Sequence, residues 1–462
     1  MKKILYILSL GFLMACAVSC SNDFFGQYPS NNVTEGNFYQ TEADFNQGVY
    51  ACYAKLKTEM GFYRSELSYR ADEADLESMA VSTQDRYDLD HFQQNSSNPI
   101  LSAVWNAWYN GIYRCNDVLD HIKTTSLSSE KMDQYKGECL FIRSWYNFML
   151  YKVFGGVPII SRVVSPVEVK GIARCTDSEM LECLETDLKE AIRLLPATRP
   201  AEKARVSKIA AQALLGKVYL TYKMYPEAEA VLSGALADSG YGLMPTTAAA
   251  FDVSNKMNKE IIFALCYNKS NSFGHGYWWS SNTGVEADRR IPTPQSRALF
   301  DEAKDNRWPL IHDFIKISSS VYAMPKWNDT YDATYTDQVG NDFPLIRYAD
   351  VVLSYAEALG LGGRIPDAIP YLNQTRTRAG LDPLPDGPMS EEAFRKELCD
   401  ERGREFTYEG QRWFDLVRLG LAVDYFHSLG YAIDEHELIF PIPNDQIEIY
   451  NNTQVLWQNP GY

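Results

Sequence analysis

Apolar side chains recur at three- and four-residue intervals along much of the chain, which is the period of an amphipathic helix. The pattern is clearest in residues 42–60, 101–123, 131–154 and 178–195, where each stretch places its apolar side chains on one face. Such a stripe is more often a core face than a binding site, so we predict four long helices that pack through these faces. The tryptophans that fall within helical patterns, and are therefore expected in the core, are Trp105, Trp108, Trp145 and Trp413.

Two further segments predict pairs of helices joined by a tight turn. Residues 207–236 begin with a candidate N-cap, Ser207, and carry a Leu-Gly-x-x-Tyr run before a turn at residues 224–226. Residues 345–378 repeat this arrangement more loosely around a glycine-rich turn. Small residues that let paired helices approach closely are typical of tetratricopeptide repeats. Together with two or three degenerate repeats, these units predict a helical solenoid scaffold.

Residues 237–344 lack any long amphipathic pattern and are rich in aromatic side chains, including the run His-Gly-Tyr-Trp-Trp-Ser-Ser-Asn at 275–282. Long loops of this kind are usually functional or disordered, and the aromatic content argues against disorder. We therefore predict a loop-rich, ligand-binding region beside the scaffold. The predicted helical scaffold comprises residues 41–61, 101–236 and 345–430, and the predicted loop-rich region comprises residues 62–100 and 237–344.

The first twenty residues are typical of an export signal. Two lysines precede an apolar stretch at residues 4–17, which is too short to span a bilayer, since a spanning helix takes about 20 apolar residues. Small residues before Cys20 and polar residues after it resemble a bacterial lipobox. We predict a signal peptide over residues 1–19, lipidation at Cys20, and a tether over residues 20–40. Cys16, which follows Leu-Met-Ala, is the alternative acylation site, and a plain secretory signal is a weaker interpretation.

The amino-acid composition argues against several classes of function and of stabilising site. Lys and Arg total 44 against 60 Asp and Glu, a net charge of −16, and this weakens any case for a nucleic-acid partner. The cysteines beyond Cys20 are odd in number and show no Cys-x-x-Cys pair, so neither a disulfide framework nor a zinc site is predicted. Cys115 and Cys139 lie in helical patterns and are expected to be small buried apolar residues.

Two sets of charged residues could carry chemistry. The first is an acidic cluster of Asp72, Glu73, Asp75 and Glu77. It could hold a structural calcium ion, but the EF-hand spacing is absent and a solvated acidic loop is the favoured interpretation. The second set is Glu401, Arg402, Arg404, Glu405, Glu409 and Arg412. Its helical spacings suit a salt-bridged helix surface or a structural core network, although two of its carboxylates could form the acid/base pair of a glycosidase.

Several short motifs follow one another in order along nearly the whole chain. They include Trp105-x-x-Trp108-Tyr109, Phe141-Ile142-Arg143, Phe154-Gly155-Gly156-Val157-Pro158, Leu345-Ile346-Arg347-Tyr348-Ala349-Asp350, Glu401-Arg402-Gly403-Arg404-Glu405-Phe406, Arg412-Trp413-x-Asp415-Leu416 and Asn459-Pro460-Gly461-Tyr462. As an ordered set they resemble the SusD/RagB family of outer-membrane nutrient-binding lipoproteins. The resemblance implies a mostly α fold over residues 41–462, a single domain in which a tetratricopeptide-like helical scaffold carries a loop-rich, ligand-binding subregion.

The resemblance also implies a function. It predicts a non-enzymatic lipoprotein on the outer membrane of a Gram-negative bacterium, which captures oligosaccharide or polysaccharide and delivers it to a SusC-like TonB-dependent transporter. No cofactor is predicted. The alternatives are a surface enzyme acting on glycans, and a transporter lid with a non-sugar ligand such as a peptide.

We expect the ligand to bind where segments 78–95 and 268–335 converge on one exposed face. Sugars present apolar C–H faces to aromatic rings and hydroxyl groups to polar side chains. Tryptophans without helical partners are the better candidates for exposed platforms, although a loop tryptophan is about as often an anchor for its own loop. The predicted binding residues are Arg86, Tyr87, Tyr277, Trp278, Trp279, Asn282 and Trp327.

Overall fold

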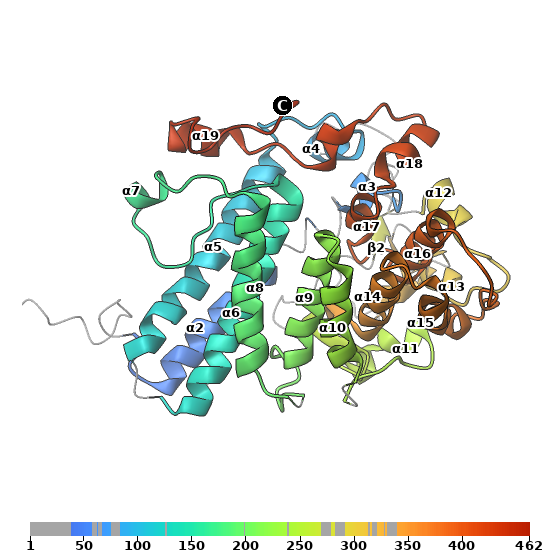
Figure 1. Ribbon diagram of the computed structural model, residues 1–462, viewed down its shortest axis with the longest axis horizontal. Coiled ribbons are helices and arrows are strands. Elements are labelled where there is room, and N and C mark those ends of the chain that lie inside the picture. The colour runs from blue at the N-terminus through green and yellow to red at the C-terminus, as the bar shows by residue number, and fades with distance from the viewer. Residues whose placement is uncertain are drawn as a thin grey trace, which may run out of the picture.

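Helices dominate the computed structural model of this chain, which is drawn in Figure 1. The residues that it describes are 38–57, 62, 67–74, 84–124, 127–197, 199–237, 240–268, 279–281, 292–312, 315–316, 321–327, 329 and 340–462. Cys20, the signal peptide and most of the tether lie outside these ranges. No helix among the described residues combines the length and the apolar character needed to cross a bilayer.

The N-terminal half is a group of long helices that lie side by side: α2 (Glu42–Leu56), α5 (Pro99–His121), α6 (Ser129–Phe154) and α8 (Asp177–Leu194). Side chains of Thr41, Asn98, Ser128 and Thr176 cap their first turns by accepting backbone N–H groups. These four helices match the four predicted stretches to within a few residues.

Two helical hairpins continue the scaffold. The first consists of α9 (Lys208–Thr221), capped by Ser207 as predicted, and α10 (Tyr225–Leu236). The second consists of α14 (Tyr348–Leu361) and α15 (Ile365–Arg378), and α14 also packs against α10. A Cβ atom at Gly216 would lie 2.5 Å from the Leu232 side chain, so a glycine is needed where α9 meets α10. The helix pairs are confirmed, and their assignment as tetratricopeptide repeats stays a prediction.

The predicted loop-rich region contains two small antiparallel sheets. Strand β1 (Ile261–Leu265) pairs with β5 (Phe343–Arg347), and every residue of both strands is buried. The other sheet has the order β2 (Trp279–Ser281), β4 (Val321–Ala323) and β3 (Ile315–Lys316). A strand pair that is buried throughout lacks the alternating pattern of a surface strand, which explains why periodicity did not reveal it.

The remaining helical segments, most of them short, complete the described part of the chain. The α-helices are α3 (Leu67–Arg70), α4 (Gln84–Asp90), α7 (Pro166–Val169), α11 (Thr247–Ala250), α12 (Pro294–Ala298), α13 (Trp308–His312), α16 (Glu391–Glu405), α17 (Arg412–Arg418), α18 (Ala422–Ser428) and α19 (Asn444–Tyr450). The 3-10 helices are η5 (Ile122–Thr124), η6 (Val253–Asn255), η9 (Pro325–Trp327) and η10 (Glu435–Leu438). In Figure 1, α4, α19 and the C-terminus form a layer across the top of the long helices.

A buried network of ion pairs ties β5 to the helices that follow it. Arg347, which is 1% exposed, donates to Glu260 Oε1 at 2.7 Å, to Glu405 Oε1 at 3.0 Å and to Glu409 Oε2 at 2.8 Å. Arg307 donates to Glu401 Oε1 at 2.8 Å in the same interior. The charged set after residue 400 is therefore a core network, which was one of its two predicted structural roles.

The hydrophobic core is a large cluster that runs from Phe45 to Leu456, with a small second cluster of Met257, Ile261 and Ala264. All four tryptophans predicted to be core residues are at most 5% exposed. Cys115 and Cys139 are also buried, and both are free thiols. These predictions are confirmed.

Candidate functional site

The structure describes only part of the predicted ligand site. Arg86 and Tyr87 lie on α4 and are half-buried. The backbone of Trp279 belongs to β2, where it pairs with Ala323 of β4. The Trp279 side chain and the predicted residues Tyr277, Trp278 and Asn282 lie outside the described part of the chain.

Trp327 corrects the prediction of an exposed platform. Its ring is fully buried, stacks on Phe343 with 5.3 Å between ring centroids, and meets the edge of Phe251 at 5.0 Å. The neighbouring Lys326 donates to Glu409 Oε1 at 2.7 Å, which fixes η9 in the interior. Trp327 is therefore an anchor for its own segment and not a ligand contact, which was the alternative role of a loop tryptophan.

The two parts of the predicted loop-rich region meet in the structure. Ala74 forms an antiparallel bridge with Pro292, and the Thr293 hydroxyl donates to the Asp72 carbonyl oxygen. Residues far apart in the sequence therefore lie together at the base of both long segments. Because Ala74 precedes the predicted binding segment 78–95, this contact does not test the expected convergence of that segment with 268–335, which stays a prediction.

The acidic cluster at this junction is not solvated as predicted. The carboxylate of Asp72 is 4% exposed, accepts from Arg412 Nε at 3.0 Å, and also accepts from the Tyr425 hydroxyl. Glu73 is 2% exposed and accepts from the Ser68 hydroxyl at 2.9 Å and from the Tyr408 amide at 2.9 Å. The solvated interpretation is wrong for these two residues because their oxygens hold the segment onto the core. The other two members, Asp75 and Glu77, lie outside the described ranges.

A half-exposed aromatic surface lies on and beside α4. The Tyr87 ring stacks on His91 with 3.8 Å between centroids and 13° between planes, and His91 meets the edge of Tyr431 at 6.3 Å. We call Tyr87, His91 and Tyr431 the aromatic shelf. All three are partly exposed, so part of each side chain is accessible from solution. Tyr87 lies on α4 and His91 directly follows its last residue, so the two are four residues apart, a spacing that would have identified the pair from the sequence.

The buried Arg70 side chain supports the aromatic shelf through Phe92. Phe92 packs against Tyr431 at 5.4 Å, and the Arg70 guanidinium lies 3.9 Å from the centre of the Phe92 ring. Arg70 also donates to the Leu89 carbonyl oxygen at 3.0 Å and to Gln94 Oε1 at 2.8 Å. Burial lowers the pKa of Arg70 to about 9. These contacts make α4 a firm support for its aromatic side chains.

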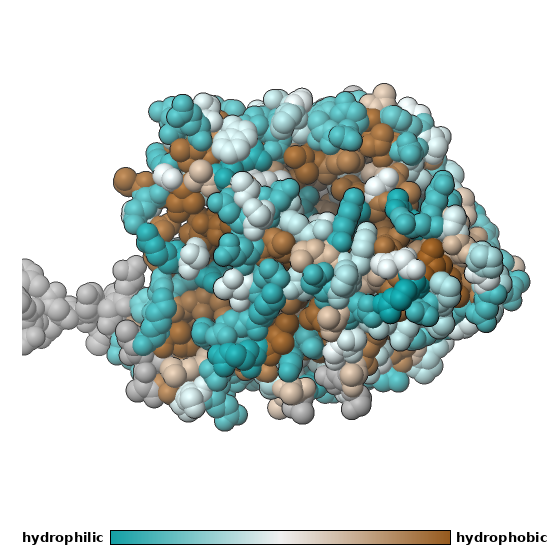
Figure 2. Space-filling model, viewed as in Figure 1, coloured by the Kyte–Doolittle hydropathy of each residue, from teal (hydrophilic) through white to brown (hydrophobic). Residues whose placement is uncertain are grey.

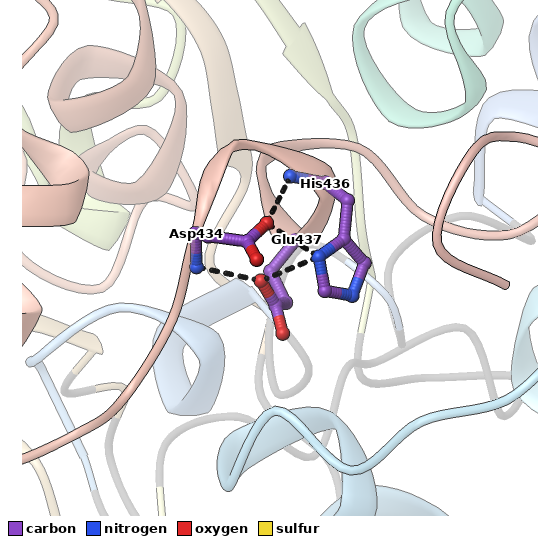
Figure 3. A group of neighbouring side chains, drawn as sticks. All are labelled: Asp434, His436 and Glu437. Carbon is purple, nitrogen blue, oxygen red and sulfur yellow. Dashed lines mark hydrogen bonds and ion pairs between the residues drawn. The ribbon is translucent and has the colours of Figure 1, made fainter.

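A second polar cluster comes from η10. His436 Nδ1 lies 2.5 Å from Asp434 Oδ1 and 3.1 Å from Glu437 Oε2 (Figure 3). The two carboxylates form the capping box of this short helix, in which the Asp434 side chain accepts from the Glu437 amide and Glu437 Oε2 accepts from the Asp434 amide at 2.7 Å. Asp434 Oδ1 also accepts from the His436 amide at 2.9 Å. Helix capping accounts for this group, and we assign it no ligand.

The carboxylates considered for hydrolysis are unsuited to it. Glu401 and Glu405 are completely buried, and the surrounding arginines hold the pKa of each below its usual value despite burial. A glycosidase needs one carboxyl group with a raised pKa in contact with the substrate. Both residues are instead ionised partners in the core network, which removes them as an acid/base pair.

Two family models match the chain. The one described as "Starch-binding associating with outer membrane" matches residues 27–220, and the one described as the SusD family matches residues 315–462. The chain belongs to the SusD family, as the order of its motifs predicted.

Named relatives agree with this assignment. SusD-like protein P2 of Formosa agariphila is 26% identical, and the alignment covers the full length of both chains. The starch-binding protein SusD of Bacteroides thetaiotaomicron is 23% identical over 87% of this chain and 86% of its own. The name of the latter protein describes starch binding.

Solved structures share the fold. A crystal structure of a SusD superfamily protein from Bacteroides vulgatus superposes with a TM-score of 0.77 at 25% identity, covering 92% of this chain and all of that one. A laminarin binding SusD-like protein gives the same TM-score and coverage at 24% identity. The mostly helical SusD-like architecture is thereby confirmed.

Proposed function

We propose that this chain is a cell-surface lipoprotein that binds glycans and delivers them to a SusC-like TonB-dependent transporter in the outer membrane. The observation that carries the proposal is the aromatic shelf, three partly exposed rings that contact one another on and beside α4. Aromatic faces of this kind stack on the apolar faces of sugar rings. The starch-binding description of the family model and of the Bacteroides thetaiotaomicron relative supports the same ligand class.

The shelf is the part of the site that can be tested on described side chains. Calorimetric titration of the mature chain with maltohexaose and with laminarihexaose should show saturable binding of at least one sugar. Truncating a binding hot spot costs about 2 kcal/mol, or roughly thirtyfold in affinity, so Tyr87→Ala should weaken binding by about that factor. Trp278→Ala and Trp279→Ala test the predicted residues of the second segment in the same way.

Tyr113→Ala is the matched control, because Tyr113 is 47% exposed on α5 and is no part of the shelf. Tyr113→Ala should bind sugar as the parent does. Equal affinity in Tyr87→Ala, Trp278→Ala and Trp279→Ala would place the site elsewhere. Release of new reducing ends during incubation would favour the enzyme alternative, and retention of peptide without sugar would favour a peptide-binding lid.

Membrane anchoring is tested separately. If Cys20 carries the lipid, Cys20→Ala should move the protein from the membrane fraction to the soluble fraction. Release by Cys16→Ala with retention of Cys20→Ala would move the acylation site to Cys16.

The transporter partner is tested at native expression. Extraction in mild detergent should recover a large β-barrel protein together with this chain. Recovery of the chain alone would contradict that part of the proposal.

A further inference from the structure

A cavity of about 330 Å³ lies between the C-terminal half of α6, α9 and α17, and Leu438 and Ile439 form one edge of it. In the space-filling view, apolar surface appears in a hollow between the upper layer that carries α4 and the tops of α9 and α17 (Figure 2). The cavity shares no lining residue with the aromatic shelf. Ligand pockets in proteins typically measure about 300 to 1,000 Å³, so this cavity suits a small molecule.

The walls of the cavity are largely apolar and partly aromatic. The ring-bearing or aliphatic side chains that line it include Trp145, Phe148, Met149, Leu214, Phe414 and Leu438. Phe414 and Leu438 are only half-buried, so the apolar lining continues to the surface. Such a pocket is favourable for an apolar ligand body and becomes selective through a few polar groups.

One cation in the wall has no counter-ion. The Lys152 ammonium lies 3.9 Å from the centre of the Phe414 ring and 4.7 Å from that of Phe148. Within the described part of the chain, no carboxylate lies within ion-pair distance of Lys152, and its ammonium donates no hydrogen bond. Burial holds the pKa of Lys152 well below its usual value; the cations Lys217 and Arg418 lower it further, and the more distant carboxylates of Asp415 and Asp350 oppose them.

Among the other charged groups of the wall, Lys217, Arg418 and Glu409 are ion-paired, whereas Asp177 is an exposed carboxylate for which the described residues supply a neutral hydroxyl donor and no ion pair. Lys217 donates to Asp350 Oδ2 at 2.6 Å, and Arg418 donates to Asp415 Oδ1 at 2.6 Å. Glu409 accepts from both Arg347 and Lys326, as described above. Asp177 accepts from the Tyr151 hydroxyl at 2.9 Å. Lys152 is therefore the cation of the wall whose ammonium has neither an ion pair nor a hydrogen bond among the described residues, and it lies against two phenyl rings.

We propose that this cavity binds a small aromatic carboxylate, whose carboxylate group pairs with the Lys152 ammonium and whose ring packs among the Trp145, Phe148 and Phe414 side chains. A ligand carboxylate supplies the ion pair that the Lys152 ammonium lacks among the described residues, and a charge-assisted hydrogen bond in a poorly solvated site is stronger than a neutral one. A planar ring fits the aromatic lining through offset or edge contacts. The site is separate from the proposed glycan site and does not depend on it.

Three probes separate the contributions of charge and ring. The mature chain is titrated by NMR with trans-cinnamate, with cinnamyl alcohol, which has the same ring without the charge, and with acetate, which has the charge without the ring. We expect saturable cinnamate binding that is at least tenfold tighter than that of cinnamyl alcohol and of acetate.

Lys152→Met keeps an unbranched, apolar side chain of similar length and removes the positive charge at its end. It should weaken cinnamate binding at least tenfold and leave the binding of cinnamyl alcohol unchanged. Lys170→Met is the matched control, because Lys170 is exposed at the end of α7, and it should bind cinnamate as the parent does. Thermal melting of both variants reports whether they are folded.

The proposal is overturned if folded Lys152→Met binds cinnamate as tightly as the parent, if acetate binds as tightly as cinnamate, or if no probe binds saturably at millimolar concentration. Should Lys152→Met fail to fold, a second variant, Val417→Phe, tests the site instead. Val417 is a half-buried residue of the cavity wall on α17, and the larger phenylalanine side chain would occupy the cavity. That variant should also lose cinnamate binding, and full binding by it would equally overturn the proposal. Sugar binding by Lys152→Met should match that of the parent.

Discussion

At the scale of single residues, burial separates two aromatic side chains that the sequence placed in one site. Trp327 is enclosed by Phe251 and Phe343, whereas Tyr87 keeps part of its ring exposed beside His91. Trp327→Ala should therefore lower the free energy of unfolding by about 3–5 kcal/mol, because it leaves a cavity in the core. Tyr87→Ala should lower it by less than about 1.5 kcal/mol, the size of one aromatic contact. Urea unfolding measures both, and equal losses would contradict the assignment of Tyr87 to the surface.

Glu73 gives a prediction on pH. Burial raises its pKa to about 8, against about 4.5 in the unfolded chain, so the unfolded chain loses this proton at lower pH. The free energy of unfolding should therefore fall as pH rises from about 4.5 to about 8, and this contribution should level off above that range. Glu73→Gln keeps the oxygen that accepts from the Tyr408 amide and removes the titration.

The measurement for Glu73 is the difference between Glu73→Gln and the parent in urea titrations at pH 5, 6.5 and 8. The variant should gain on the parent as pH rises, by an amount on the order of a few kcal/mol across the range. A difference that is the same at all three values would show that Glu73 is ionised in the folded protein throughout.

At the scale of elements, two helical glycines should respond to alanine with opposite signs. A Cβ atom at Gly360 of α14 would overlap the buried Phe394 ring, whereas one at Gly234 of α10 would meet only the end of the Gln212 side chain. Gly360→Ala should destabilise by about 1–3 kcal/mol because overpacking outweighs the better helix propensity. Gly234→Ala should stabilise by up to about 1 kcal/mol. Thermal melting distinguishes them, and a gain in both variants would show that Phe394 can move aside.

Helices were predictable from the sequence where their apolar side chains recur with the helical period. The long helices and the two hairpins follow from apolar spacing, Ser207 and turn glycines, because these signals are local. The pairing of β1 with β5 was not predictable, since Ile261–Leu265 and Phe343–Arg347 are short, buried on both sides and far apart in the chain. The burial of Trp327 depends on that pairing, so its position could not be inferred from its own surroundings in the sequence.

The residues of the candidate site also divide into those with a local signal in the sequence and those whose surroundings depend on distant contacts. Tyr87 lies on a short helix within a segment predicted as loop, and its partner His91 was missed although the spacing of four residues was visible. Asp72 and Glu73 looked like solvent-exposed acids because their partners, Arg412 and Tyr408, lie more than 330 positions away. A charge's environment is set by such distant contacts, which no local pattern reports.

At the scale of the whole molecule, the buried ion pairs connect segments that are remote in the sequence. Glu260 precedes β1, Arg347 ends β5, and Glu405 and Glu409 lie at and beyond the end of α16. Bringing such charges out of water costs free energy that their mutual attraction offsets only while every partner is present. The network should therefore affect stability most when a single member is removed.

Arg347→Met tests this, because it removes one cation that faces three carboxylates and replaces it with an apolar side chain. Leaving buried carboxylates without a partner costs about 3–5 kcal/mol, which is a large part of the stability of a typical domain, so the variant should melt well below the parent. The control is Arg193→Met, which removes an exposed pair with Glu190 on α8 and should melt as the parent does. Coincident melting of Arg347→Met and Arg193→Met would mean that the buried carboxylates find protons or other cations, and that the molecule is held together by its apolar core without the network.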